Sequence, residues 1–144
     1  MAFEVVRAPT YRLLGRAALT TNFTTSSTHT TQQDEGLSVS VTYNPSRILR
    51  VTLQVSPGAS GGAQGVVYRV LRTSTVVNAW TNSRALSTIF GDAMTYTCTF
   101  AGPATGGTET FKVQMCALSS NTAVNSYGNA SEPRVLTVED IGPQ

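Results

Sequence analysis

The sequence predicts an all-β protein, either an antiparallel β-sandwich or a jelly-roll-like barrel. Its strongest signal is strict alternation, in which apolar residues are separated by single polar ones. Two such rows follow each other closely, one from Leu37 to Tyr43 and the other from Leu49 to Val55. Successive side chains of a strand point to opposite faces, so each row gives one face to a core and the other to solvent.

Two further observations favour the same fold class. Turn residues recur about every 8 to 12 residues, a spacing typical of sandwiches and barrels built from short strands. Charged residues make up 12% of the chain, about half of the roughly 25% found in an average protein. Thr and Ser supply the polarity instead, and the β-branched Thr packs well on a pleated sheet without a charge partner.

The 144 residues are predicted to form an N-terminal arm, residues 1–10, and a single β-sandwich domain, residues 11–144. The segment 11–19 is predicted to be a strand, and the Thr/Ser-rich tract 20–33 fits an edge strand or a long loop. We expect Asp34, Glu35 and Gly36 to form a turn before the first alternating strand. Asn44, Pro45 and Ser46 make a tight connection to the second.

In the second half of the chain, the glycine-rich segment 56–65 is predicted to be a flexible hairpin connection into a strand over 66–72. The segment 73–89 fits short strands and a helical turn equally well. A hairpin-like loop is expected over 101–107. Further strands are predicted over 94–100, 108–118, 121–127 and 134–139, with 121–127 pairing with 108–118.

The distribution of charged and apolar residues argues against two classes of partner, nucleic acids and membranes. The formal net charge of +2 comes from scattered arginines that alternate with apolar residues, whereas nucleic-acid binders carry a dense basic patch or stripe. Solvent-facing strand positions are therefore expected for them, with no nucleic-acid partner. Glu4 and Arg7 interrupt the apolar start of the chain, which is unlike a signal peptide. No apolar stretch approaches the roughly 18 to 20 residues that span a bilayer, so no membrane partner is expected.

The residue chemistry does not indicate an enzyme. The single histidine, His29, has no Cys or carboxylate at ligand spacing, and the Gly-x-Ser-x-Gly elbow of many hydrolases is missing. The adjacent carboxylates at 34–35 and 139–140 fit turn residues and the end of a strand better than a calcium site. We therefore expect no catalytic residue, no metal and no cofactor. Cys98 and Cys116 fall on opposite phases of adjacent predicted strands, which favours free thiols over a disulfide.

Five residues are candidates for an interaction surface: Phe3, Val5 and Val6 in the arm, and the aromatic residues Trp80 and Tyr127. Apolar residues in an arm can anchor it on a neighbouring molecule, and exposed aromatic residues often dominate contacts with proteins or sugars. Trp80 is more readily a core residue, because it is the single tryptophan and lies in an apolar context.

The order of features along the chain resembles that of a known group. The segments YRLLGRAALTTN, DEGLSVSVTY, RILRVTLQV, VVYRVLR, GTETFKVQM and PRVLTVEDIGP are similar to those of small β-rich virion proteins of tailed bacteriophages that infect actinobacteria. The resemblance spans most of the chain and is closest over 134–143. These proteins are generally minor tail or other structural proteins, and their shared patterns are strands and turns rather than catalytic motifs.

The resemblance implies a role in assembly. We expect the chain to be located in a virion that is assembled in the cytoplasm of a bacterial host, as a minor tail protein, with capsid decoration as the alternative. Its partners would be other copies of itself, with a trimer favoured, and phage capsid or tail proteins, with host-surface glycans as a further candidate. A carbohydrate-binding module is the alternative from another class, and it requires Trp80 or Tyr127 to be exposed among convergent polar groups.

Overall fold

The computed structural model describes residues 11–25, 31–59, 65–82, 93–118 and 123–143. Its regular elements in these ranges are ten strands: β1 (Arg12–Leu19), β2 (Phe23–Thr24), β3 (Gln33–Tyr43), β4 (Arg47–Ala59), β5 (Val66–Arg72), β6 (Thr75–Asn82), β7 (Met94–Ala101), β8 (Gly107–Ala117), β9 (Val124–Tyr127) and β10 (Arg134–Pro143). The described part of the chain holds no helix long and apolar enough to cross a membrane.

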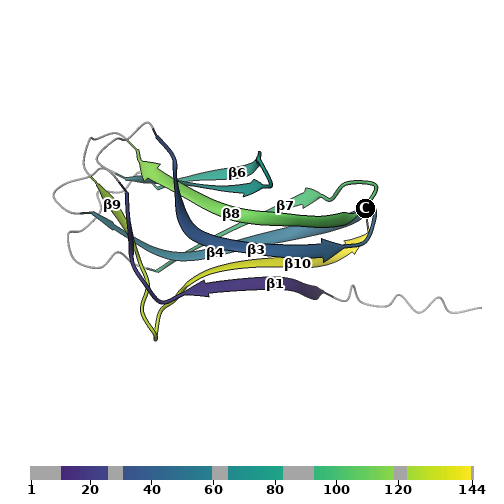
Figure 1. The fold of residues 1–144 in the computed structure, drawn as a ribbon, viewed down its shortest axis with the longest axis horizontal. Helices are drawn as coiled ribbons and strands as arrows, with labels where there is room; N and C mark the ends of the chain where they lie inside the picture. Colours follow the sequence, from purple (N-terminus) through teal and green to yellow (C-terminus); the bar gives the residue numbers. More distant parts are fainter. Residues whose placement is uncertain (1–10, 26–30, 60–64, 83–92, 119–122, 144) are drawn as a thin grey trace, which may run out of the picture.

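The strands form two antiparallel sheets that pack face to face (Figure 1). In the first sheet, β10 and β7 pair with the same stretch of β4 from opposite edges, and β1 lies outside β10. The far end of β4 continues the sheet through β9 to β2. The second sheet has the order β3-β8-β5-β6. The predicted antiparallel sandwich is confirmed, in the form of two separate sheets rather than a closed barrel.

The core lies between the two sheets and consists of the inward rows that the alternation predicted. Completely buried side chains come from the central strands of both sheets, namely Leu49, Val51 and Leu53 of β4, Phe111, Val113 and Met115 of β8, Tyr68 and Val70 of β5, and Leu136 and Val138 of β10. On β4 and β8 the neighbours of these residues, such as Arg50, Thr52, Lys112 and Gln114, are polar and less buried. On β5 and β10 the alternation is less strict, because Leu71 and Val135 are also buried.

Strand β4 is longer than the sequence pattern predicts. Residues 56–59 were expected in a flexible loop, but Ser56 to Ala59 pair with β9. Gly58 allows a close approach of the two strands here, because a Cβ atom at this position would clash with Cε2 of Tyr127. The glycine therefore lets the aromatic ring lie directly on the backbone of β4.

Two predicted hairpins and one predicted strand pairing are wrong for a common reason. Segments 56–65 and 101–107 were expected to be hairpins, yet each joins a strand of the first sheet to a strand of the second. The strand at 124–127, β9, pairs with β4 and β2 instead of β8. Turn residues look alike whether the chain returns to its own sheet or crosses to the other. Among the described strands, only β5 and β6 are both consecutive and paired, which settles residues 75–82 of the ambiguous segment as a strand.

The sandwich is closely packed along one of its sides. There β1 lies against β3, and a Cβ atom on Gly15 would come within 2.7 Å of both Val39 Cγ2 and Val41 Cγ1. The pairing of β1 with β10 shifts register between Leu13 and Gly15, as expected of a β-bulge. The glycine at this shift allows an edge strand of the first sheet to lie directly on the second sheet.

Candidate functional site

The opposite side of the sandwich is formed by β6 and β7, which are edge strands of different sheets. Their side chains meet in an antiparallel sequence of pairs: Asn82 with Met94, Trp80 with Tyr96, and Asn78 with Cys98. The rings of Trp80 and Tyr96 are stacked, with centroids 5.5 Å apart and planes at 25°. Tyr96 also contacts Tyr68 in the core, at a centroid distance of 5.8 Å. Side chains, rather than backbone hydrogen bonds between the two strands, therefore close this side.

Both strands leave one edge of their backbone unpaired within the described ranges. β7 pairs only with β4, and β6 pairs only with β5. Neither strand contains a charged residue or a proline. Natural proteins usually protect exposed sheet edges with charges, prolines or bulges, because an open edge accepts a strand from another chain. β7 has none of these three protections, since its pairing with β4 runs from Met94 to Ala101 without a register shift.

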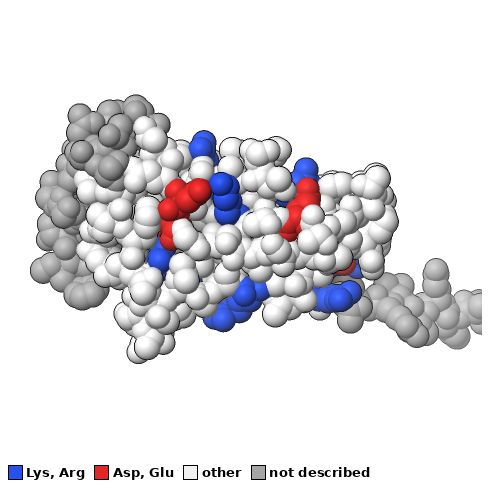
Figure 2. All heavy atoms as spheres, in the orientation of Figure 1, with Lys and Arg blue, Asp and Glu red and all other residues white. Residues whose placement is uncertain are grey.

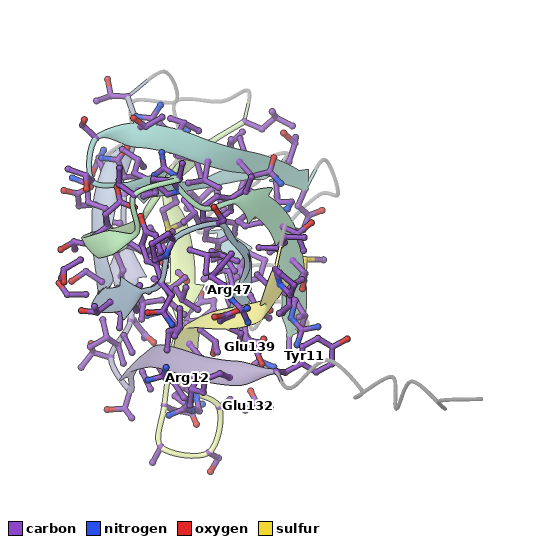
Figure 3. The ribbon with its side chains drawn as sticks, turned by 90° about the vertical axis from the view of Figure 1, so that its right-hand side faces the viewer. Tyr11, Arg12, Arg47, Glu132 and Glu139 are labelled. Atoms are coloured by element: carbon purple, nitrogen blue, oxygen red, sulfur yellow. The ribbon has the colours of Figure 1, made fainter. Side chains whose placement is uncertain are left out.

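The edge strands on the other side are protected. β1 carries Arg12 and Arg16 as well as the register shift near Gly15. β3 carries Asp34 and Glu35, and its pairing with β8 shifts register between Asp34 and Ser38. Figure 3 shows Arg12 on β1, and Glu139 of β10 pairs with this strand opposite Leu13. Among the described edge strands longer than two residues, β6 and β7 therefore differ from β1 and β3 in carrying no charged residue.

Hydroxyl groups cover much of the outer faces. On β7 the outward residues Thr95, Thr97 and Thr99 are exposed, and the Thr97 hydroxyl lies 3.5 Å from that of Thr52 on β4. On the second sheet, hydroxyls pair across β3 and β8 at 2.7 Å, Ser40 with Thr110 and Thr42 with Thr108. These faces combine hydrogen-bonding capacity with little charge.

The charged residues of the strands are mostly paired across neighbouring strands. Arg50 contacts Glu139 at 2.8 Å, Arg47 contacts Asp140 at 2.8 Å, and Lys112 contacts Asp34 at 3.2 Å. Figure 2 shows the charged side chains of one face as small separate groups of both signs. The scattered arrangement predicted for the arginines is confirmed on this face. Arg134 is an exception to the predicted solvent-facing positions, because it is completely buried.

A buried polar cluster was not predicted from the sequence. Glu35 on β3 and Arg134 on β10 form an ion pair inside the sandwich, with Tyr68 of β5 and Ser126 of β9 also fully buried beside them. Burial raises the pKa of Glu35 to about 7, against the opposing effects of Arg134 and Ser126. Burial also raises the pKa of Tyr68 well above its usual value. Glu35 was expected in a turn, but it lies within β3, where the pairing with β8 shifts register between Asp34 and Ser38.

The structure does not bring the predicted interaction residues together. Trp80 is half-buried on β6 in the second sheet and packs against the core. Tyr127 is half-buried on β9 in the first sheet, where its hydroxyl accepts a hydrogen bond from Asn125 at 3.3 Å. Neither residue forms an exposed aromatic platform. Phe3, Val5, Val6 and His29 lie outside the described residues.

A groove of about 320 Å³ lies on the first sheet beside the segment 131–133 and is lined by Arg16, Gln54, Thr95, Glu132 and their neighbours. Its described lining contains no aromatic side chain on which a sugar ring could stack. The described residues also hold no group of three or more His, Cys, Asp or Glu arranged for a metal ion. Cys98 and Cys116 are free thiols, as predicted, but they lie on different sheets rather than adjacent strands.

No protein-family model matches the chain, and no curated protein matches it. Among solved structures, the insecticidal delta-endotoxin Cry8Ea1 from Bacillus thuringiensis aligns with a TM-score of 0.50 and 11% identity, over 85% of this chain and 19% of that one. The VP2 subviral particle of infectious bursal disease virus gives 0.49 and 9%, over 100% and 42%. A cyclase from Fischerella sp. TAU gives 0.48 and 20%, over 76% and 57%. The chain thus spans less than two thirds of these proteins, and the delta-endotoxin likeness is one of fold alone.

Proposed function

We propose that this chain is a non-enzymatic structural subunit of a phage virion, and specifically a minor tail component. The observation that carries the proposal is the difference between the two sides of the sandwich. One side has edges protected by charges and bulges, while the other presents β7 as an eight-residue edge with no charge, proline or register shift. Such an edge suits a protein whose role is to add strands and subunits to an assembly.

The outer faces support the same role. A permanent interface requires its polar groups to lose water, and this cost is much larger for charges than for hydroxyls. The charged side chains of the strands are mostly paired across neighbouring strands, and the faces between them carry Thr and Ser. Contacts on these faces therefore need little desolvation of ions and can still form hydrogen bonds across an interface.

The setting in a phage tail rests on the sequence resemblance, which spans most of the chain and is closest over residues 134–143. The resemblance is to β-rich proteins, and the described residues form two antiparallel sheets. The alternative role in capsid decoration uses the same edges and faces, and differs only in where the subunit docks. The carbohydrate-binding alternative loses its expected platform, because Trp80 packs on Tyr96 and against the core.

Immunogold labelling tests the proposal. Antibodies raised against the purified chain are applied to virus particles produced by the phage that encodes the chain. Gold at the tail is the expected result. Gold on the head would replace the tail assignment with capsid decoration, and purified particles without label, confirmed by immunoblotting, would overturn the virion role.

A matched pair of variants connects the labelling to the β7 edge. Thr97→Lys places a charge in the middle of the open edge strand, whereas Thr137→Lys places the same charge on the same outer face, but on β10 between β1 and β4. We expect Thr97→Lys to reduce incorporation into particles at least tenfold and Thr137→Lys to leave it nearly unchanged. Equal incorporation of both variants would show that assembly does not use β7.

A further inference from the structure

We propose that two copies of this chain join edge to edge through β7, in an antiparallel pair about a twofold axis at Thr97. The first sheets of the two copies then form one continuous sheet. The inference names a partner for the open edge in the proposed assembly, and it rests on the proposed function only for its biological setting. Its physical basis is the backbone of β7, which pairs with β4 on one side and has no strand on the other within the described ranges.

The alternation of β7 determines the register of such a pair. Thr95, Thr97 and Thr99 face outward, whereas Met94, Tyr96, Cys98 and Phe100 face inward and are half-buried. In a continuous sheet, outward residues must lie opposite outward residues, because a slip of one position would exchange the two faces. The two registers that keep the faces matched and overlap most are centred on residue 97 or 98.

Only the centre at Thr97 places every outward threonine opposite another threonine. Thr97 then lies opposite Thr97 of the second copy, and Thr95 lies opposite Thr99 in both directions. On the inward face, Tyr96 lies opposite Cys98, and Met94 opposite Phe100. Cross-strand Thr–Thr pairs are favourable, and large apolar residues meet on the face that continues the core. Since β7 has no charged residue, pairing it with its own copy brings no like charges together.

Of the other described edge strands, β2 has two residues and the longer ones do not permit an equally regular pair. Self-pairing of β1 would bring the arginines of both copies, Arg12 and Arg16, to the same contact, and like charges across a sheet are unfavourable. The register shift in β3 interrupts its edge between Asp34 and Ser38. β6 is uncharged but has a register shift opposite Val70 and Leu71.

The neighbouring strand β6 adds a second layer to the contact. Trp80 of β6 stacks on Tyr96 of β7, so a copy that reaches the β7 edge also approaches β6. Val76 on β6 is 45% exposed, while Tyr11 and Leu13, at and next to the start of β1, are 59% and 57% exposed. The contact therefore joins both sheets of each sandwich, which gives it more area than one pair of strands.

Cysteine cross-linking tests the twofold register directly. Paired residues of an antiparallel ladder have Cα atoms about 4.5 to 5.5 Å apart, within the range of about 4.4 to 6.8 Å that a disulfide spans. Under mild oxidation we expect Thr97→Cys to form a linked dimer by itself. Thr95→Cys and Thr99→Cys should link when mixed, but not alone. Thr137→Cys and the wild-type chain, with its own Cys98 and Cys116, are the controls and should stay unlinked.

Sedimentation of the wild-type chain and of the two lysine variants gives an independent measurement. We expect the wild type and Thr137→Lys to be dimers. The dissociation constant of the dimer should be at least tenfold larger for Thr97→Lys. Near-ultraviolet circular dichroism of each variant confirms that it is folded. A monomer at high micromolar concentration would overturn the inference, as would a trimer in which Thr97→Cys does not cross-link.

The two proposals fail separately. Particles labelled by the antibody together with a monomeric purified chain would retain the virion role and reject the β7 pair. A cross-linked dimer that is missing from particles would do the reverse. Linking of Thr95→Cys alone would reject the proposed register even if the chain is dimeric.

Discussion

Glu35 and Arg134 form an ion pair in the interior of the sandwich, with Nη1 of the arginine 3.5 Å from Oε2 of the glutamate and side chains 2% and 0% exposed. The guanidinium also donates hydrogen bonds to two backbone carbonyls, that of Glu35 at 2.9 Å and that of Thr21 at 2.8 Å. One buried side chain therefore connects β10 to β3 and to the segment between β1 and β2. The burial of Glu35 outweighs the attraction of Arg134 in setting the pKa of the carboxyl group.

The raised pKa of Glu35 predicts a component of stability that decreases toward alkaline pH. The pKa rises from its ordinary 4.5 to about 7 on folding, so the folded state favours the protonated form. The stabilisation is fully present below about pH 4.5 and is lost as the pH rises through about 7, with a total of about 3 kcal/mol at roughly 1.4 kcal/mol per pKa unit. Urea unfolding between pH 4.5 and 8 measures it.

Glu35→Gln is the control for this effect, because an amide of the same shape does not titrate. The difference in free energy of unfolding between wild type and variant isolates Glu35 from the other carboxylates. We expect this difference to shift by about 3 kcal/mol, in favour of the wild type at the acid end. A difference that stays constant across the pH range would show that Glu35 does not titrate on unfolding.

Replacing Arg134 with Met is expected to destabilise the fold by about 3 to 5 kcal/mol at pH 8, because it leaves the Glu35 carboxylate buried without its ion-pair partner. The loss should be smaller at pH 5, where the carboxyl group is protonated. The double variant with Glu35→Gln should recover part of the loss at pH 8, and the two backbone carbonyls left without a donor account for the remainder. Additive effects of the two changes in such a double-mutant cycle would argue against a coupled pair.

Gly15→Ala is expected to destabilise the protein by about 1 to 3 kcal/mol, the usual cost of overpacking. The added methyl group would lie 2.7 Å from Val39 Cγ2 and Val41 Cγ1, so β1 must move away from β3. Thermal unfolding measures the effect. Ala18→Ser, at an exposed position of the same strand, is the control and should change stability by less than about 0.5 kcal/mol. Similar effects of both changes would mean that β1 does not pack closely on β3.

Trp80→Ala is expected to destabilise the fold by about 3 kcal/mol, because it removes the ring that stacks on Tyr96 and packs against the core. Trp80 is the single tryptophan, so its fluorescence reports directly on this side of the sandwich. In the wild type, its emission should shift to longer wavelength on unfolding in urea. Full stability of the variant would place the ring outside the packed core.

The alternation of the sequence predicted the strands of the core, and it contained more than we inferred from it. The inward row of β3 extends back from Leu37 to Glu35 in the same phase, and that of β10 runs from Leu136 back to Arg134 and on to Asp140. The composition of Asp34, Glu35 and Gly36 indicated a turn, and the scattered arginines, Arg134 among them, indicated solvent-facing strand positions. Continuing each row through its charged ends would have placed both Glu35 and Arg134 on inward faces.

Strand partners could not be predicted in the same way. The loops after β4 and β7 have the composition of hairpin turns but cross between sheets, and local turn chemistry does not determine which sheet receives the next strand. One property of the unprotected edge could be predicted from the sequence, namely that residues 75–82 and 94–101 contain no charged residue. That these strands lie at sheet edges depends on contacts with strands far away in the sequence.

The position of β10 has a consequence for biosynthesis. This strand is made after the other nine, yet it lies between β1 and β4 and supplies Leu136 and Val138 to the core. During synthesis, β1 and one edge of β4 therefore remain unpaired until β10 has left the ribosome. Because so many pairings join distant parts of the chain, native structure should appear late and slowly. Premature termination before β10 should therefore yield an aggregation-prone fragment rather than a smaller folded domain.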